Sequence, residues 1–273
     1  MRPESSRSPR TTAVRFDYGV SGVDESSDWL LFDAGNTRLK WARTEADGIV
    51  ERGAIAWSEL MHADWQQALP GASRVRQVAL AQVLAPERAD VLRAALLSRF
   101  GRVREVRSEA SCAGLRSAYR HSERLGVDRW LGMLAAWQPG EALLLANIGT
   151  ALTLDAVDAQ GQHLGGSILA GLQAMQSGLL NAAPGLQRLM DDDERECRLW
   201  ADDSAMAIRS APVFAATALI EMAARRLRNQ LKTPLRCVVA GGDAAVVQAQ
   251  LQIDCELRRD LVLEGLWKRV RMP

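Results

Sequence analysis

Two short polar turns, each placed between apolar segments, are the residues best suited to chemistry in this chain of 273 residues. The first is Asp33-Ala-Gly35-Asn36-Thr37 and the second is Asn147-Ile-Gly149-Thr150. Each ends an apolar strand with a carboxylate or an amide, turns at a glycine and enters a second strand. Glycine lets the backbone approach a bulky anion, and the N–H groups of such a turn point outward as donors. The residue types therefore predict two phosphate-binding turns.

The spacing of the two turns adds a second argument. They begin 114 residues apart, at Asp33 and Asn147, which is about the length of a domain. This spacing indicates an internal duplication, whose halves would face each other across a cleft. Two facing turns would clamp the β- and γ-phosphates of ATP, and Asp33 could hold Mg²⁺ beside them. Either turn alone is also compatible with an ordinary β-hairpin.

Two glycine pairs follow other apolar strands. Gly241-Gly242 ends the strand VVA, and Gly165-Gly166 lies within HLGGSIL. Glycines at a strand end allow the flat approach of a ligand such as an adenine ring or a ribose. Each pair by itself is equally typical of a plain turn between elements.

Asp128 is the candidate catalytic base. It lies in a predicted helix whose residues one turn on, Leu131, Gly132 and Ala135, are apolar or small, so burial would raise its pKa. A kinase acting on a primary alcohol needs such a group to take the hydroxyl proton. The neighbouring Arg129 could bind an anionic substrate or a partner subunit. The alternative is an ordinary Asp–Arg surface pair near the start of a helix.

The elements that must position these residues alternate between strands and helices. Apolar runs predict strands, and periodic segments bounded by Pro and Gly predict helices. We expect strands at 29–33, 38–44, 48–57, 76–83, 103–106, 142–147, 151–158, 163–169 and 235–240, and helices at 58–69, 86–99, 125–137, 172–182, 203–230, a segment ending near 250, and 261–270. The alternation predicts an α/β protein with a mixed sheet in each half.

Composition limits the remaining possibilities. Lys plus Arg is 34 and Asp plus Glu 33, a net charge of +1, which gives no electrostatic reason to expect a nucleic-acid or membrane partner. Residues 1–28 lack the apolar run of a signal peptide and are predicted to be a disordered extension. No segment reaches roughly 18 uninterrupted apolar residues. Four scattered cysteines indicate reduced thiols rather than a disulfide framework. We expect a cytoplasmic protein.

The histidines and the longest acidic run are predicted to have structural roles or to face solvent. His62, His121 and His163 show no metal-ligand spacing and are predicted to be exposed or structural. The acidic run at 191–196 is predicted to be a solvated loop.

The motifs, taken in order, resemble those of the type III pantothenate kinases, members of the ASKHA superfamily that includes sugar kinases and actin. The set comprises DAGNT (33–37), GVDR (126–129), NIGTALT (147–153), GG (165–166) and GGDA (241–244), with Tyr119 seven residues before Gly126. The resemblance covers the chain from Trp29 to its end. It implies two RNase H-like (actin-like) domains, at 29–138 and 139–273, with mixed sheets flanked by helices and a cleft between them.

The resemblance also implies a reaction and its participants. ATP would phosphorylate the primary hydroxyl of pantothenate, the first step toward coenzyme A, with Mg²⁺ and a monovalent cation (K⁺ or NH₄⁺). Asp128 would be the base, and the pantothenate pocket would be formed by Tyr119, Gly126, Asp128, Arg129 and Gly166. A homodimer partner would complete this pocket from a helix in which Ser204 stands where the family has Thr. Nucleotide and phosphate contacts are expected from Asp33, Gly35, Asn36, Thr37, Arg38, Lys40, Asn147, Gly149, Thr150, Gly241 and Gly242.

The chain departs from the family pattern at the second turn. Asn147 replaces the first Asp of that motif, and an amide holds a cation less strongly than a carboxylate. Asp33 is therefore expected to be the main Mg²⁺ ligand and Asn147 the weaker one. Asp155, later on the same hairpin, remains as a carboxylate. Two other functions stay open: another ASKHA small-molecule kinase, for example a sugar kinase, and a non-catalytic relative that binds a nucleotide and regulates.

Overall fold

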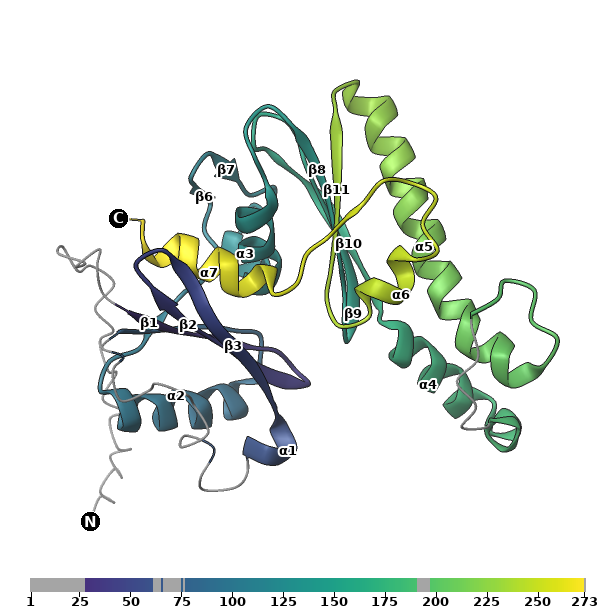
Figure 1. Cartoon of the computed structure of the whole chain (residues 1–273), viewed down its shortest axis with the longest axis horizontal. Coiled ribbons are helices and arrows are strands. Elements are labelled where there is room, and N and C mark those ends of the chain that lie inside the picture. Colours follow the sequence, from purple (N-terminus) through teal and green to yellow (C-terminus); the bar gives the residue numbers. More distant parts are fainter. Residues whose placement is uncertain (1–27, 61–64, 66–74, 76, 191–196, 273) are drawn as a thin grey trace, which may run out of the picture.

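A computed structural model describes residues 28–60, 65, 75, 77–190 and 197–272 (Figure 1). The predicted N-terminal extension, with the exception of Asp28, lies outside these residues, as do His62 and the acidic run at 191–196. Of the predicted helix 58–69, the structure describes a helix only at Trp57–Leu60, named α1. The other predicted helices and strands are present with bounds shifted by a few residues.

Two five-stranded mixed sheets form the framework. The first has the order β3-β2-β1-β4-β5 and the second the order β10-β9-β8-β11-β12. In each sheet the first three strands along the chain are antiparallel neighbours, and the other two run parallel to the central strand. The strands of the first sheet are β1 (Trp29–Ala34), β2 (Arg38–Glu45), β3 (Gly48–Ala56), β4 (Gln77–Gln82) and β5 (Arg104–Glu105). Those of the second are β8 (Ala142–Ile148), β9 (Ala151–Val157), β10 (His163–Ala170), β11 (Leu235–Ala240) and β12 (Glu256–Leu257).

The matching strand order explains the paired turns in the sequence. β1 and β8 are the central strands, covered on both faces, and for this reason they read as almost continuous apolar runs. Each continues through its polar turn into an antiparallel neighbour, β2 or β9. The predicted α/β fold with a mixed sheet in each half is confirmed. The predicted domain boundary at 138/139 stays a prediction.

Helices cover both faces of each sheet (Figure 1). The outer face of the first sheet packs on α2 (Pro86–Phe100), and that of the second packs on α5 (Ser204–Leu231) and α6 (Ala244–Gln248). Between the sheets lie α3 (Val127–Ala136) and α7 (Leu261–Val270), which share one apolar core with strands of both sheets. A Cβ at Gly265 would lie 2.0 Å from the Leu131 carbonyl oxygen, so only glycine permits this close crossing of α3 and α7.

The long helix α5 is also apolar enough, by length and composition, to cross a membrane. Half of the relevant segment is buried inside the structure, where Val213, Ala216, Ile220 and Ala224 pack on the second sheet. Its apolar residues are therefore explained by packing. The remaining described elements are short or peripheral: β6 (Ser111–Cys112), β7 (Leu115–Arg116), η3 (Ser122–Arg124), α4 (Leu172–Ala182) and η4 (Pro184–Leu189).

Candidate active site

The two predicted turns meet across the gap between the sheets. The Oγ1 atoms of Thr37 and Thr150 lie 2.7 Å apart, a hydrogen bond between residues 113 positions apart in the chain. Thr37 follows β1 and Thr150 follows β8, so each sheet contributes one turn at equivalent positions. The structure thus brings together the pair of turns that the sequence predicted to face each other.

The first turn is held through its backbone. The Gly35 N–H donates to the Arg38 carbonyl at 3.2 Å, and the Trp57 indole N–H donates to the Gly35 carbonyl at 2.8 Å. The Arg88 guanidinium donates to the Asn36 carbonyl at 3.3 Å. The side chains of residues 36–38 are exposed. The backbone is therefore fixed while the polar side chains of this turn remain available to a ligand.

The second turn is packed against two glycines. A Cβ at Gly171 would lie 1.9 Å from the Gly149 carbonyl oxygen, and a Cβ at Gly241, which has φ +104°, would lie 2.1 Å from the Ile148 carbonyl oxygen. Neither position accepts another residue without moving the turn. A Cβ at Gly242 would meet no described atom within 4 Å. Of the predicted pair, Gly241 supports the turn, and Gly242 leaves the open surface that a ligand would need.

A small cavity of about 30 Å³ lies between the two halves. Its lining includes Lys40, Asp128, Arg129, Asn147, Gly241 and Asp260. This volume holds a water molecule or a small ion. Predicted nucleotide residues from both halves therefore share one enclosed space with the predicted base.

Asp33 is the most perturbed carboxylate in this region. Burial raises its pKa from 3.8 to about 7, Lys40 opposes the rise, and the negative charges of Asp128 and Asp260 add to it. Within the described part of the chain the Asp33 side chain accepts no hydrogen bond. A desolvated carboxylate that accepts no hydrogen bond suits a metal ion or a metal-bound water. The residues present therefore fit the predicted Mg²⁺ site.

Asp128 lies in the first turn of α3. Burial is the main cause that raises its pKa, and its Oδ1 accepts the Arg129 N–H at 2.8 Å, which works in the opposite direction. A Cβ at Gly126 would lie 2.6 Å from this same Oδ1 atom. The predicted rise in the Asp128 pKa is confirmed in direction, and glycine at 126 leaves the space that the carboxylate occupies.

Arg129 belongs to a buried network rather than to a surface pair. Its Nε and Nη2 donate to the two Asp155 carboxylate oxygens at 3.0 and 2.6 Å, and its Nη1 donates to the Tyr119 hydroxyl at 3.0 Å. Three of the five guanidinium donors are occupied, leaving two for a ligand. A Cβ at Gly166 would lie 2.4 Å from Arg129 Nη2, so glycine is needed beside the guanidinium.

His163 completes this network. It is buried, its Nε2 lies 3.1 Å from Asp155 Oδ1, and its ring stacks on Tyr119 with an interplanar angle of 5°. The Ala118 N–H donates to its Nδ1 at 3.4 Å, so Nε2 carries the proton and donates to Asp155. The prediction of a structural role for His163 agrees with these contacts. Nothing in the sequence indicated that His163 and Arg129 would share Asp155 as a partner, because this contact depends on how β10 pairs with β9.

Ser204 is not brought to this site within one chain. It is exposed at the first position of α5, on the face of the second sheet opposite α3. Asp203 caps this helix, its Oδ1 accepting the Met206 N–H at 2.8 Å.

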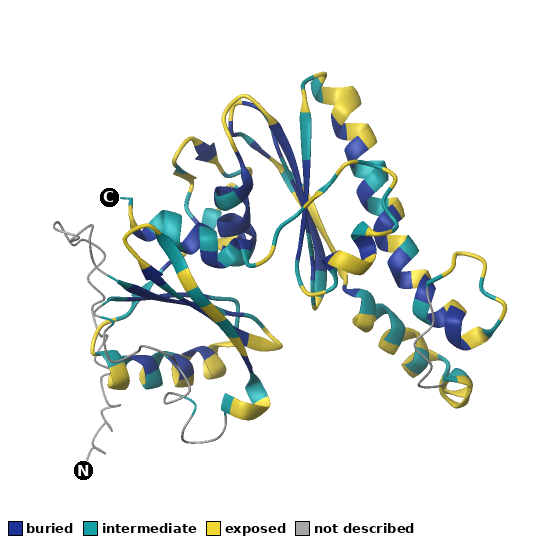
Figure 2. Ribbon diagram, viewed as in Figure 1, coloured by how far each residue is buried: buried dark blue, intermediate teal, exposed yellow. Residues whose placement is uncertain are grey.

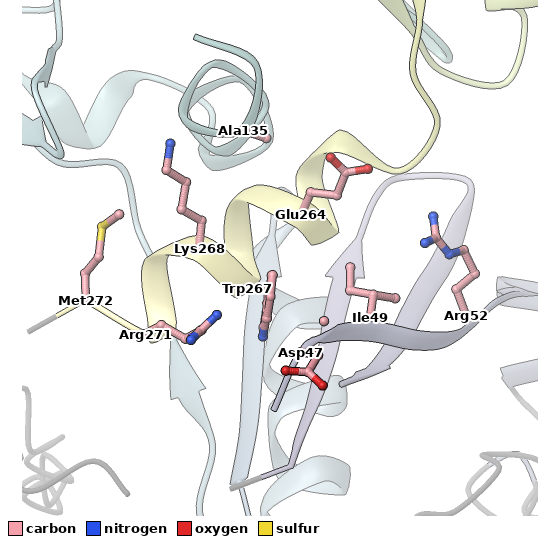
Figure 3. A pocket seen from close by; sticks show the side chains of 10 residues that line it. Asp47, Ile49, Arg52, Ala135, Glu264, Trp267, Lys268, Arg271 and Met272 are labelled. Carbon is pink, nitrogen blue, oxygen red and sulfur yellow. The ribbon is translucent and has the colours of Figure 1, made fainter. Parts of the chain in front are cut away.

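A larger hollow of about 710 Å³ lies elsewhere (Figure 3). Asp47 and Ile49 of the β2–β3 hairpin line one side, and Trp267, Lys268 and Arg271 of the C-terminal segment line the other. It contains none of the predicted site residues. The candidate active site is therefore located by its polar and charged side chains, between the two turns, and not by the size of the cavity.

Comparison with known proteins points to one family. The family model described as type III pantothenate kinase matches residues 29–226. A type III pantothenate kinase from Laribacter hongkongensis is 41% identical over 249 residues, covering 89% of this chain and 98% of that protein. One from Nitrosococcus oceani is 33% identical, covering 87% and 91%. Among solved structures, a conserved putative Baf family transcriptional activator from Campylobacter jejuni superimposes with a TM-score of 0.57 at 15% identity, covering 89% and 97%, a likeness of fold alone.

Proposed function

This chain belongs to the family of type III pantothenate kinases, and from that premise we propose how its cleft carries out the ATP-dependent phosphorylation of pantothenate. The acceptor is the primary hydroxyl, and the product, 4'-phosphopantothenate, leads to coenzyme A. The observation that carries the proposal is the contact between Thr37 and Thr150, which joins the two predicted phosphate turns beside Asp33 and Asp128.

The two turns provide the phosphate-binding surface. In the first turn the exposed Asn36, Thr37 and Arg38 side chains supply donors, and in the second the exposed Thr150 hydroxyl does the same. The Gly149 N–H is already bonded to the Ala151 carbonyl at 3.0 Å, so Gly149 contributes the close approach of the backbone rather than a free donor. Lys40 adds a positive charge in the cavity below them. Phosphoryl transfer depends mainly on positioning and on neutralising charge. Rigid turns with polar side chains free for the ligand meet both needs.

Asp128 accepts the hydroxyl proton of pantothenate. Its carboxylate is desolvated, which raises its basicity, and Gly126 leaves it room at the start of α3. The two remaining donors of Arg129 bind the polar end of the substrate, with Tyr119 and Gly166 beside them. The Asp155 carboxylate and His163 hold the guanidinium in this orientation.

Asp33 is the residue we propose to hold Mg²⁺, with the Asn147 amide oxygen as a weaker, uncharged ligand. When bound, Mg²⁺ supplies positive charge to the phosphates. The described residues contain no cluster of three His, Cys, Asp or Glu that would form an all-protein metal cage. A single carboxylate fits a metal that is shared with substrate phosphates. K⁺ or NH₄⁺ is the second cation we propose, on the resemblance of the motifs alone.

A homodimer is supported by exposed apolar side chains on neighbouring elements of the second half. Ile168 and Leu169 on β10, Leu179 on α4 and Leu189 on η4 are 64%, 41%, 45% and 44% exposed. α4 has no buried residue at all, and β10 is a sheet edge (Figure 2). Exposed apolar side chains beside an unpaired sheet edge are typical of a surface that another chain covers. We propose that a second copy covers this dimer face and brings Ser204 of its α5 toward the pantothenate pocket.

A coupled assay tests the proposed function. Pantothenate, ATP, Mg²⁺ and K⁺ should yield ADP and 4'-phosphopantothenate in equal amounts, and a hexose in place of pantothenate should yield neither. ADP formation only with the hexose would favour a sugar kinase. ADP no higher than background with any alcohol would favour a nucleotide-binding regulator and overturn the proposal. We expect the reaction in the cytoplasm, and fluorescence of a tagged chain in fractionated cells checks that expectation.

A further inference from the structure

Asp260 has an unusual backbone for its position. It precedes α7 with φ 57° and ψ 31°, the left-handed region that costs a non-glycine residue free energy. An Asp at this position usually accepts an N–H of the first helical turn, as Asp203 does for α5 at 2.8 Å. The Asp260 side chain makes no such bond. Both the backbone strain and the missing cap indicate that the carboxylate is needed elsewhere.

The carboxylate is directed at two cations of the first sheet. Its Oδ1 lies 3.3 Å from Lys40 Nζ and its Oδ2 lies 3.4 Å from Arg52 Nη1. Lys40 and Arg52 come from β2 and β3, more than 200 positions earlier in the chain. Lys40 and Asp260 both line the small cavity that also contains Asp128 and Asn147. The segment before α7 therefore contributes a charged residue to the candidate active site.

Lys40 has a second carboxylate within its reach. In the antiparallel pair of β1 and β2, Lys40 is directly opposite Asp33. Side chains in such positions start about 5 Å apart on the same face of the sheet. Lys40 nevertheless makes its ion pair with Asp260, and the Asp33 side chain has no ion pair within the described residues. Without Asp260, the nearest place for the ammonium would be the Asp33 carboxylate.

We propose that Asp260 is a positioning residue that holds the Lys40 ammonium away from Asp33, so that the Asp33 carboxylate stays open to a divalent cation. The inference deepens the proposed function, since it rests on Asp33 as the metal ligand. An ammonium paired with Asp33 would occupy the same lone pairs that a metal ion uses. Asp260 accordingly acts through Lys40 and touches neither the metal nor the substrate.

The test measures divalent-cation binding directly. Mn²⁺, which is visible by electron paramagnetic resonance, is titrated into the full chain with saturating ADP, with no pantothenate present. Asp260→Asn should weaken Mn²⁺ binding by roughly fivefold, the effect of a competing ion pair of ordinary strength. In the Lys40→Met background the same Asp260→Asn change should have a much smaller effect, because the competing ammonium is gone and only the direct charge of Asp260 on Asp33 is lost.

Two further variants separate positioning from folding. Asp260→Gly removes the carboxylate and relieves the left-handed strain, so it should weaken Mn²⁺ binding while keeping or raising the melting temperature. Arg52→Met removes the other partner of Asp260. Because the Arg52 side chain is nearly half exposed, this change should leave the Mn²⁺ affinity within about twofold of wild type.

The proposal is overturned by wild-type Mn²⁺ affinity in Asp260→Asn, by a weakening of undiminished size in the Lys40→Met background, or by loss of the fold in both Asp260 variants. A wild-type chain that binds no Mn²⁺ with ADP overturns it as well. A chain that passes the Mn²⁺ tests but does not phosphorylate pantothenate would refute the proposed function and leave the role of Asp260 standing.

Discussion

Burial of the Asp33 carboxylate destabilises the fold, and the same carboxylate is the proposed Mg²⁺ ligand. Its pKa is raised to about 7, mainly because burial disfavours the charged carboxylate. The folded state therefore binds the proton more tightly than the unfolded chain, in which an Asp titrates near 3.9. From this group alone, stability falls as pH rises from about 4 to 7. A carboxylate that stays buried although its burial lowers the stability of the fold is typical of a functional site.

Replacing Asp33 should separate stability from activity. Asp33→Asn removes the cost of ionisation, roughly 4 kcal/mol as an upper value, so the melting temperature at pH 8 should rise by about 5 °C or more. At pH 5, where folded Asp33 is already protonated, the gain should be much smaller. Activity should be lost at both pH values. Calorimetry at the two pH values checks this, and an equal gain at both would contradict an electrostatic cause.

Asp128 governs the expected pH dependence of the reaction. Its pKa is raised by burial, and a general base must be deprotonated to accept the hydroxyl proton. kcat/KM for pantothenate should therefore fall as pH drops through this raised pKa, at a higher pH than an ordinary Asp would give. Asp128→Asn should reduce kcat by about 100-fold or more while the circular dichroism spectrum stays unchanged. Retained turnover in this variant would refute the assignment of the base.

At the scale of elements, the register of β9 and β10 positions residues of the proposed pantothenate pocket. Gly166 pairs with Asp155 across these strands, which places it against the Arg129 guanidinium. The pocket thus depends on a strand pairing as much as on the helix that bears Asp128. The two glycines beside the second turn, Gly171 and Gly241, show the same dependence on close packing.

A methyl group at Gly166 tests this packing. Its Cβ would lie 2.1 Å from the Leu154 carbonyl and 2.4 Å from Arg129 Nη2, so Gly166→Ala must displace one of them. We expect a loss of about 1–3 kcal/mol in unfolding free energy and a higher KM for pantothenate, with a smaller change in KM for ATP. Gly185→Ala, where a Cβ meets nothing within 4 Å, is the matched control. Unchanged kinetics in Gly166→Ala would show that Arg129 is placed by other contacts.

At the scale of the whole molecule, α3 and α7 join the two sheets through one shared core. This arrangement brings turns and charges from both halves to a single cavity. The proposed dimer face lies along β10 and α4 of the second half. The strand β10 therefore contributes residues both to the candidate site, with Gly166, and to the proposed partner surface, with Ile168.

A charge on the dimer face should break the dimer. Ile168→Glu places a carboxylate at a position that is 64% exposed in the single chain and would be covered in the dimer. Sedimentation velocity should show a monomer, and KM for pantothenate should rise because Ser204 of the partner is lost. Val91→Glu, at a 71% exposed position on α2, should remain dimeric. A wild-type monomer, or a dimeric Ile168→Glu variant, would contradict the proposed face.

Much of the fold and part of the site could be predicted from local patterns. Apolar runs interrupted by Gly35 and Gly149 marked the central strands and their turns, because buried strands need apolar residues and tight turns need glycine. The apolar residues one turn beyond Asp128 predicted its burial and the direction of its pKa shift.

Only the tertiary structure decided which charges share the site. Lys40 lies opposite Asp33 yet pairs with Asp260, 220 positions away, and His163 reaches Asp155 through the pairing of two strands. No local pattern encodes such pairs, because they depend on how separate elements pack. The sequence by itself determined where the turns, the base and the glycines lie along the chain. The crossing of α3 and α7 between two sheets decided that they lie close together, since burial and charge depend on neighbours in space.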